Sequence, residues 1–118
     1  MNAKGAEDAA VLAAKYAALV LARDAALDTP RKANRFFDQA HVIAVRLRAT
    51  DEGRLALLAL LNHEDRGVRL GAAANCTPFA PDQSRAILRE LIDPRGLHSF
   101  DAEMTLHELD AGRLNMDW

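Results

Sequence analysis

The amino-acid sequence predicts an all-α fold of about six helices arranged in three antiparallel pairs. Three observations support this prediction. Leucine and alanine dominate, aromatic residues make up 5%, and there are only six glycines, a composition typical of helices packed on helices. Apolar side chains recur at helical spacing on both sides of a short corner within residues 55–76. The same pattern returns about thirty residues later, so we expect residues 1–118 to form a single domain with an ordered core at about 8–112.

The first part of the chain predicts two long helices. We expect one helix from about Asp8 to Leu27, with residues 1–6 frayed. Pro30 fits the first position of the second helix, where no amide hydrogen bond is lost, and Thr29 can cap it. This helix should run to about Arg48. The expected core residues of the first helix are Leu12, Tyr16, Leu19 and Leu27, and those of the second are Phe36, Phe37, Ala40, Ile43, Ala44 and Leu47.

The middle of the chain predicts a third and a fourth helix joined by a corner. Thr50 or Asp51 can cap the third helix, and Asp65 can cap the fourth. Small residues at 72–74 would let antiparallel helices approach closely. Arg69 lies four residues after Asp65, so the two side chains can pair on the helix face. The expected apolar stripes are Leu57, Leu58 and Leu61 on the third helix, and Val68, Ala72 and Cys76 on the fourth.

The last part of the chain predicts two more helices. Pro81 begins the fifth helix, which ends at residues 93–96. Ser99 is the expected cap of the sixth helix, and Gly112 is placed to end it. Trp118 either folds back onto the core or hangs free, and the sequence leaves both open. The expected inward residues are Ile87, Leu88 and Leu91 on the fifth helix, and Ala102, Leu106 and Leu109 on the sixth.

The helix–corner–helix stretch resembles a HEAT-type repeat. The resemblance lies in the leucine pair, the corner with Asp65, and the pairs at 68–69 and 72–73. It implies a HEAT/armadillo-like, right-handed stack in which Asp65 and Arg69 tie neighbouring repeats together. An alanine-rich helical bundle can imitate the same pattern, so that alternative stays open.

The chain from about residue 10 to 112 also resembles a family of small bacterial HEAT-like proteins that carry only an unknown-function label. The matching segments are residues 32–35, residues 63–65 with 68–69, and residues 99–106. This resemblance implies a fold and no established activity.

Composition excludes several classes of protein. A net charge of −2 gives no global attraction to nucleic acid or to an anionic membrane. The single Cys76 excludes an internal disulfide and suits a reducing cytoplasm. The longest apolar run, residues 16–22, is too short to span a bilayer. Glu7 and Asp8 stand where a signal peptide needs an apolar core, so we expect a cytoplasmic protein, and the family resemblance implies a bacterial one.

The residues suited to catalysis or metal binding form incomplete sets. His63-Glu64 resembles the start of a zinc-protease motif, but position 67 is glycine instead of the second histidine. Glu103 and His107 lie one turn apart, with Asp110 as the only easy third ligand, whereas zinc requires three or four. No glycine-rich phosphate loop is present. We therefore expect no enzyme activity, no metal and no cofactor.

These observations favour a non-catalytic interaction module that binds a protein partner, either as a monomer or as a weak homodimer. This interpretation rests on fold-level analogy, because repeat stacks usually present a surface. An immunity or antitoxin-like inhibitor is one specific version of it. The candidate partner surfaces are Glu103, His107 and Asp110 on the sixth helix, and Arg31, Lys32 and Arg35 on the second. The sixth helix can instead be only a polar cap that keeps a stack soluble.

Nucleic-acid binding through the basic region 31–54 is the alternative function. This region holds six Lys/Arg against three acids, whereas residues 82–118 hold four Arg against eight acids. Single strands stack their bases on exposed aromatic side chains. The cations that can line one surface are Arg31, Lys32, Arg35, Arg46 and Arg48. Only Phe36 and Phe37 interrupt this basic cluster, and we expect both to be buried, so a protein partner is favoured.

Overall fold

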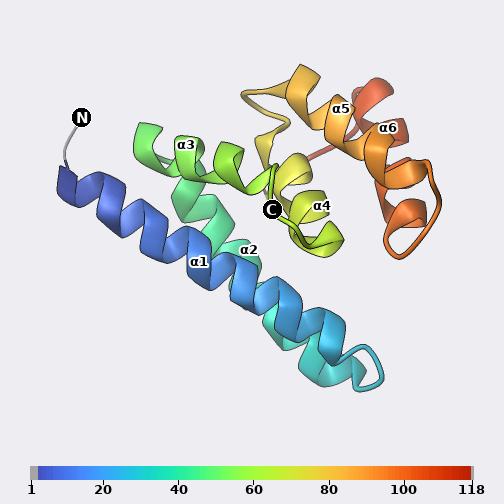
Figure 1. Cartoon of the computed structure of the whole chain (residues 1–118), viewed down its shortest axis with the longest axis horizontal. Helices are drawn as coiled ribbons and strands as arrows, with labels where there is room; N and C mark the ends of the chain where they lie inside the picture. The colour runs from blue at the N-terminus through green and yellow to red at the C-terminus, as the bar shows by residue number, and fades with distance from the viewer. Residues whose placement is uncertain (1–2, 118) are drawn as a thin grey trace. The chain divides into compact units, whose positions relative to one another are not determined.

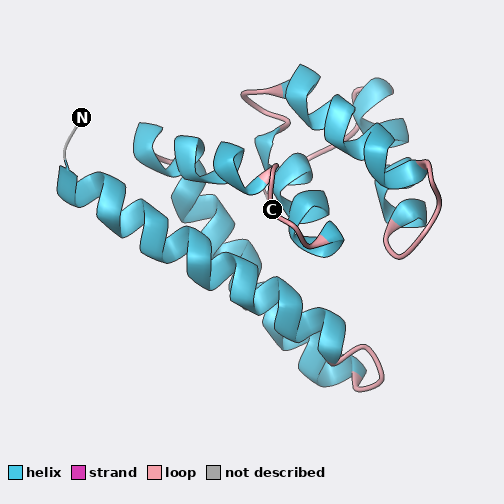
Figure 2. Ribbon diagram, viewed as in Figure 1, coloured by secondary structure: helices cyan, strands magenta, loops and turns pink. Residues whose placement is uncertain are grey.

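The computed structural model describes residues 3–117, and over this range the chain is entirely helix, turn and loop, with no strand (Figures 1 and 2). The helices are α1 (Ala3–Ala25), α2 (Pro30–Arg48), α3 (Asp51–Leu60), α4 (Arg66–Cys76), α5 (Pro81–Ile92) and α6 (Ser99–Asp110). The all-α prediction with about six helices is confirmed. The chain divides into two compact units, Met1–Leu60 and Leu61–Trp118. The single-domain expectation stays a prediction.

In the first unit, α1, α2 and α3 each pack against the other two. The α1 helix begins at Ala3 and ends at Ala25, so the expected bounds of Asp8 and Leu27 were wrong at both ends. The α1–α2 turn explains the early end, because the Ala26 amide already bonds back to the Arg23 carbonyl at 3.0 Å. Leu27 consequently falls outside the helix and is exposed.

The buried face of α1 consists mainly of small side chains at three- and four-residue spacing. Tyr16 is buried as expected, but Leu12 and Leu19 are only half-buried. The alanines between the leucines, which we expected only to favour helix formation, form the contact because they let the neighbouring helices come close. The buried residues of α1 are Ala9, Ala13, Tyr16, Ala17 and Val20.

The apolar stripe of α2 is largely as predicted. Its buried residues are Ala33, Ala40, Ile43, Ala44 and Leu47. Phe36 is half-buried, and Phe37 is 39% exposed, so its assignment to the core was wrong. The Phe37 ring instead lies 5.2 Å from the Arg23 guanidinium, a cation–π contact. Thr29 is the N-cap residue, but its side chain makes no capping bond.

The corner between α2 and α3 is closed by local polar contacts. The hydroxyl of Thr50 accepts a bond of 3.0 Å from the Gly53 amide, which identifies Thr50 as the side-chain cap. Arg54 donates to the Arg48 carbonyl at 2.7 Å and pairs with Asp51. On α3, Leu57 is fully buried, whereas Leu58 is half-buried.

In the second unit, α5 packs against both α4 and α6, and α4 touches α6. Asp65 caps α4 as predicted, accepting a bond of 3.0 Å from the Val68 amide. The core at zero exposure consists of Val68, Ala72, Ala73, Cys76, Ser84, Leu88, Leu91 and Ala102. Ile87, Leu106 and Leu109 were expected in this core and are half-buried.

The expected pairing of Arg69 with Asp65 was wrong. The Asp65 carboxylate caps α4, and the Arg69 guanidinium turns back to the corner instead. Its Nη1 donates to the carbonyl of His63 at 2.9 Å and to that of Glu64 at 3.2 Å. Arg69 therefore stabilises the corner that precedes its own helix.

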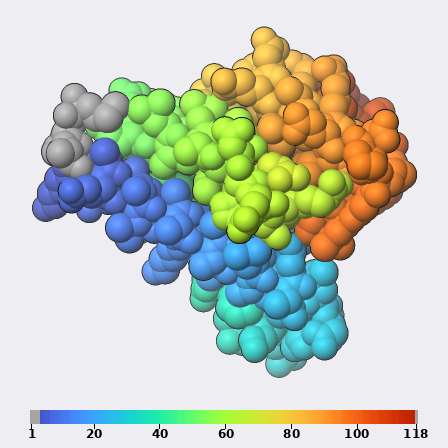
Figure 3. All heavy atoms as spheres, in the orientation of Figure 1, coloured from blue at the N-terminus to red at the C-terminus, as the bar shows by residue number. Residues whose placement is uncertain are grey.

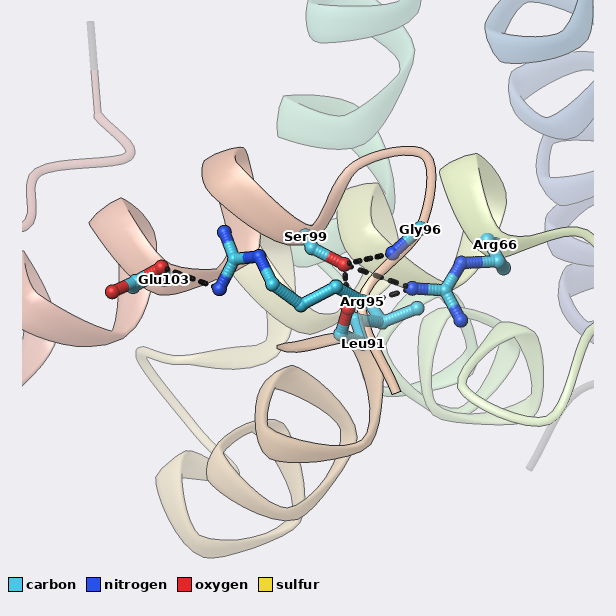
Figure 4. A network of polar contacts seen from close by, with 6 residues as sticks. All are labelled: Arg66, Leu91, Arg95, Gly96, Ser99 and Glu103. Atoms are coloured by element: carbon cyan, nitrogen blue, oxygen red, sulfur yellow. Dashed lines mark hydrogen bonds and ion pairs between the residues drawn. The ribbon is translucent and has the colours of Figure 1, made fainter. Parts of the chain in front are cut away.

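The loop between α5 and α6 is held by Arg66 and Ser99 (Figure 4). Arg66 donates to the carbonyls of Leu91 at 2.6 Å and of Leu97 at 3.0 Å. Ser99 Oγ accepts from the Gly96 amide at 2.7 Å and donates to the Leu91 carbonyl at 2.6 Å. The N-cap residue of α6 is His98, in a left-handed conformation, so the expectation that Ser99 caps α6 was wrong.

The end of α6 is as predicted. Gly112 has a φ of 73°, which glycine adopts without a steric penalty. Its amide bonds to the Leu109 carbonyl at 3.1 Å, and the Arg113 amide bonds to the Glu108 carbonyl at 2.9 Å. These two bonds form a Schellman motif. Trp118 lies outside the described residues.

Candidate functional site

The candidate residues on α6 share one solvent-exposed face, as their spacing predicted. Glu103, His107 and Asp110 are all exposed. Two of them already have cationic partners within their own unit: Glu103 pairs with Arg95 at 3.1 Å (Figure 4), and Asp110 pairs with Arg85 at 2.9 Å. Their charge is therefore partly neutralised before any partner arrives.

A third carboxylate of α6 is engaged in the same way. Glu108 accepts two bonds of 3.0 Å from the Arg113 guanidinium. These bonds, and the positive charge of Arg113, hold the pKa of Glu108 below its ordinary value. The acids at the end of α6 thus form part of an ion-pair arrangement that also fastens the segment after the helix.

Exposed apolar side chains lie beside these acids. Leu97, Phe100 and Met104 are all exposed, and Phe100 is 66% accessible. Phe100 and Met104 lie one turn apart and face the same way from α6, and Leu97 lies in the loop just before the helix. Sequence reasoning did not single out this apolar α6 patch (Leu97, Phe100 and Met104), although the one-turn spacing of Phe100 and Met104 was a signal.

The candidate residues on α2 are exposed as well. Arg31, Lys32 and Arg35 lie on the outer side of the helix start, and the cyan atoms of this segment reach the surface in Figure 3. Arg46 lies on the same side about three turns after Arg35. Among the described residues, no ion pair or side-chain hydrogen bond involves any of these four cations. Arg31, Lys32 and Arg35 thus present positive charge without an ion-pair partner among the described residues.

Two exposed valines complete this surface. Val42 is 59% exposed and Val45 is 42% exposed, although both lie within an amphipathic helix. We call the set Arg31, Lys32, Arg35, Val42, Val45 and Arg46 the basic α2 face. Sequence reasoning placed its four cations on one surface together with Arg48, but it did not include the valines.

A groove of about 350 Å³ lies within the first unit between the start of α1 and the α2–α3 corner. Its charged lining residues are Asp8, Arg46 and Glu52, and its apolar lining includes Leu12 and Leu47. Arg46 therefore belongs both to this groove and to the end of the basic α2 face.

His63 and Cys76, two residues suited to metal or thiol chemistry, hold structural positions. Within residues 3–117, no group of three or more His, Cys, Asp and Glu side chains is arranged to hold a metal. His63 Nδ1 accepts a bond of 3.0 Å from the Asp65 amide. The ring therefore stabilises the turn just before α4. Burial raises the pKa of Cys76 to about 12, which keeps the thiol protonated at neutral pH. No helix in the described part of the chain is long and apolar enough to cross a membrane.

The fold and its surfaces define a small all-α protein with exposed charged and apolar helix faces. The family described as a domain of unknown function (DUF2019) matches residues 10–110, and the chain belongs to that family. The chain is similar to the crystal structure of the protein RPA1889 from Rhodopseudomonas palustris CGA009. The two share 32% identity over 93% of this chain and 92% of that chain, with a TM-score of 0.82. A comparison with curated proteins found no match.

Proposed function

We propose that this protein is a non-catalytic interaction module that binds a protein partner. One observation carries the proposal: apolar side chains are exposed on outward helix faces. They are Val42 and Val45 of α2 and the apolar α6 patch. Scattered exposed apolar residues are ordinary, but groups at helical spacing with charged neighbours are typical of protein-binding surfaces.

We further propose that the helices follow a HEAT-like plan. The recurrence of the stripe at residues 57, 58 and 61 as residues 87, 88 and 91 supports it, as does the buried small-residue face at Ala72 and Ala73. The packing of α1 on α2 and of α5 on α6 is consistent with antiparallel pairs. An immunity or antitoxin-like inhibitor in the bacterial cytoplasm is a specific version of this proposal, and a neighbouring toxin gene would support it.

The experiment captures partners from the native cell with the full-length chain and then measures binding of the purified partner by calorimetry. Two surface variants are compared with the parent, Val42→Ser/Val45→Ser and Phe100→Ser/Met104→Ser. The proposal expects a purified partner whose binding at least one variant weakens. A chain that captures no protein, or a partner that binds both variants as well as the parent, would contradict it.

Nucleic-acid binding is the second candidate function, and one observation favours it. The four cations of the basic α2 face have no partner among the described residues. Phosphate contacts depend steeply on salt, so duplex binding that persists near physiological salt and is lost in the variant Arg31→Glu/Lys32→Glu/Arg35→Glu would promote this function.

A further inference from the structure

We propose that the basic α2 face docks an acidic amphipathic helix of a partner protein. This inference rests on the proposed function and deepens it, because it names both the docking surface and the chemistry of the partner. The argument combines the geometry of the face, its charge and its apolar half.

The six residues form a stripe along one side of α2, in which the exposed Asp38 also lies, between Arg35 and Val42. At 3.6 residues per turn, Arg31, Arg35, Val42 and Arg46 fall within about 60° of one another around the helix axis. Lys32 and Val45 flank this stripe on opposite sides. From Arg31 to Arg46 the stripe is about 22 Å long at 1.5 Å per residue. This length matches a partner helix of roughly four turns.

The positive charges at the start of the stripe have no ion-pair partner within the described residues. Arg31 and Arg35 are one turn apart, and like charges at this spacing repel. The first turn of α2 contains no acidic residue, and its N-cap makes no side-chain bond. The positive end of the helix dipole therefore adds to the repulsion. Carboxylates from a partner would relieve both effects, which makes this end of the face complementary to an acidic segment.

The apolar half of the stripe favours a protein partner over a nucleic acid. Val42 and Val45 present branched aliphatic side chains to solvent, and a phosphate backbone offers them nothing to bury against. An amphipathic helix that carries acids toward Arg31 and Arg35 and aliphatic residues toward the valines complements both halves. By contrast, Glu103 and Asp110 on α6 already pair with arginines. A basic partner would therefore form weaker electrostatic interactions with α6.

The test uses the full-length chain and four synthetic probes. The first is an acidic amphipathic helical peptide with leucines at helical spacing. The second has the same composition in scrambled order, the third replaces each glutamate by lysine, and the fourth is a DNA duplex. Binding is measured by fluorescence anisotropy at low salt and again near physiological salt.

The variants separate charge from apolar contact. Arg31→Glu/Arg35→Glu removes the complementarity, and Val42→Ser/Val45→Ser removes the apolar contact. Their matched controls are Lys15→Glu/Arg89→Glu and Val11→Ser/Leu55→Ser, which change exposed residues of the same kinds on other faces. Circular dichroism confirms that each variant retains its helices.

The proposal expects the acidic amphipathic peptide to bind more tightly than the scrambled and lysine peptides. Each face variant should weaken its binding about tenfold or more, mainly through charge for the arginines and through contact for the valines, while the controls bind as the parent does. Equal binding by face and control variants would overturn the proposal, as would absence of peptide binding at low salt. Tighter binding of the duplex, lost in Arg31→Glu/Arg35→Glu, would assign the face to nucleic acid.

The same variants distinguish this inference from the proposed function. A purified cellular partner could bind both face variants as tightly as the parent and fail to bind Phe100→Ser/Met104→Ser. That result would refute the basic α2 face as the docking surface, and the interaction function would stand. If no partner exists for any surface, the proposed function itself fails.

Discussion

Gly53 lies directly against the backbone of Leu47, where α2 and α3 meet. A Cβ added at residue 53 would stand 2.6 Å from the carbonyl carbon and 2.7 Å from the Cα of Leu47. Backbone atoms at the end of a helix cannot move aside as a flexible side chain can. The close approach of the two helices therefore requires glycine at this position.

Replacing Gly53 by alanine should destabilise the protein by about 2–3 kcal/mol, the upper part of the usual range for overpacking. Urea denaturation measures the change. The matched control is Gly5→Ala, because its Cβ would meet the side chain of Glu52 at an ordinary 3.5 Å. Alanine should be neutral or stabilising there by up to ~1 kcal/mol, since it favours helix more than glycine does. A Gly53→Ala variant as stable as the parent would contradict the close contact.

Replacing Arg66 by lysine should destabilise the second unit by roughly 1–3 kcal/mol, because an ammonium cannot reproduce the planar fork that reaches the Leu91 and Leu97 carbonyls. Hydrogen exchange provides a local readout: the amides of residues 95–98 should exchange faster. Arg89→Lys is the control, since Arg89 is an exposed arginine of the neighbouring helix α5. Equal loop protection in both variants would show that Arg66 does not hold the loop.

Replacing Ala72 by leucine should cost roughly 1–3 kcal/mol, because Ala72 has no exposed surface and a larger side chain forces its neighbours off their rotamers. Ala86→Leu is the control, at an exposed position of α5. Thermal unfolding followed by circular dichroism compares the two. An unchanged melting temperature for Ala72→Leu would place this residue at the surface.

Cys76 should be unreactive in the folded protein and react only on unfolding. Its pKa is raised by burial from 9.0 to about 12, so the folded state keeps the thiol protonated. The sign of the pH effect follows directly. The stability that comes from keeping the Cys76 thiol protonated is fully present below the thiol's pKa in the unfolded chain. It decreases as pH rises from about 9 toward 12, because in that range the thiol ionises only in the unfolded chain.

Thiol titration with an aromatic disulfide reagent, with and without denaturant, measures the reactivity. Denaturant unfolding at several alkaline pH values measures the stability. The Cys76→Ala variant is the control, since its stability should lack this part of the alkaline decrease. Rapid modification of the folded parent at neutral pH would contradict the burial of the thiol.

The chain's local signals determined most of the helix positions and the outward or inward phase of several helices. Pro30 and Pro81 begin helices, Asp65 caps α4, and Gly112 ends α6, as their residue types predict. These features depend on one or two neighbouring residues, because a cap or a left-handed glycine satisfies backbone groups within a single turn. The exposure of the candidate residues on α2 and α6 followed from helical phase, because residues three or four apart share one face of a helix.

Tertiary structure decided the contact partners of the long polar side chains and of the small residues. Arg69 bonds to the His63 carbonyl instead of the Asp65 carboxylate, and Ser99 bonds across the α5–α6 loop instead of capping α6. Arg85 reaches Asp110 from another helix, so only the folded chain shows that Asp110 is paired, whereas Arg31 and Arg35 of α2 have no ion-pair partner in the part of the chain that the structure describes. The partner of a flexible polar side chain depends on where packing places backbone atoms distant in sequence. The alanines of α1 and the glycine at 53 matter through that same packing, since the distance between two helices is set by both partners together.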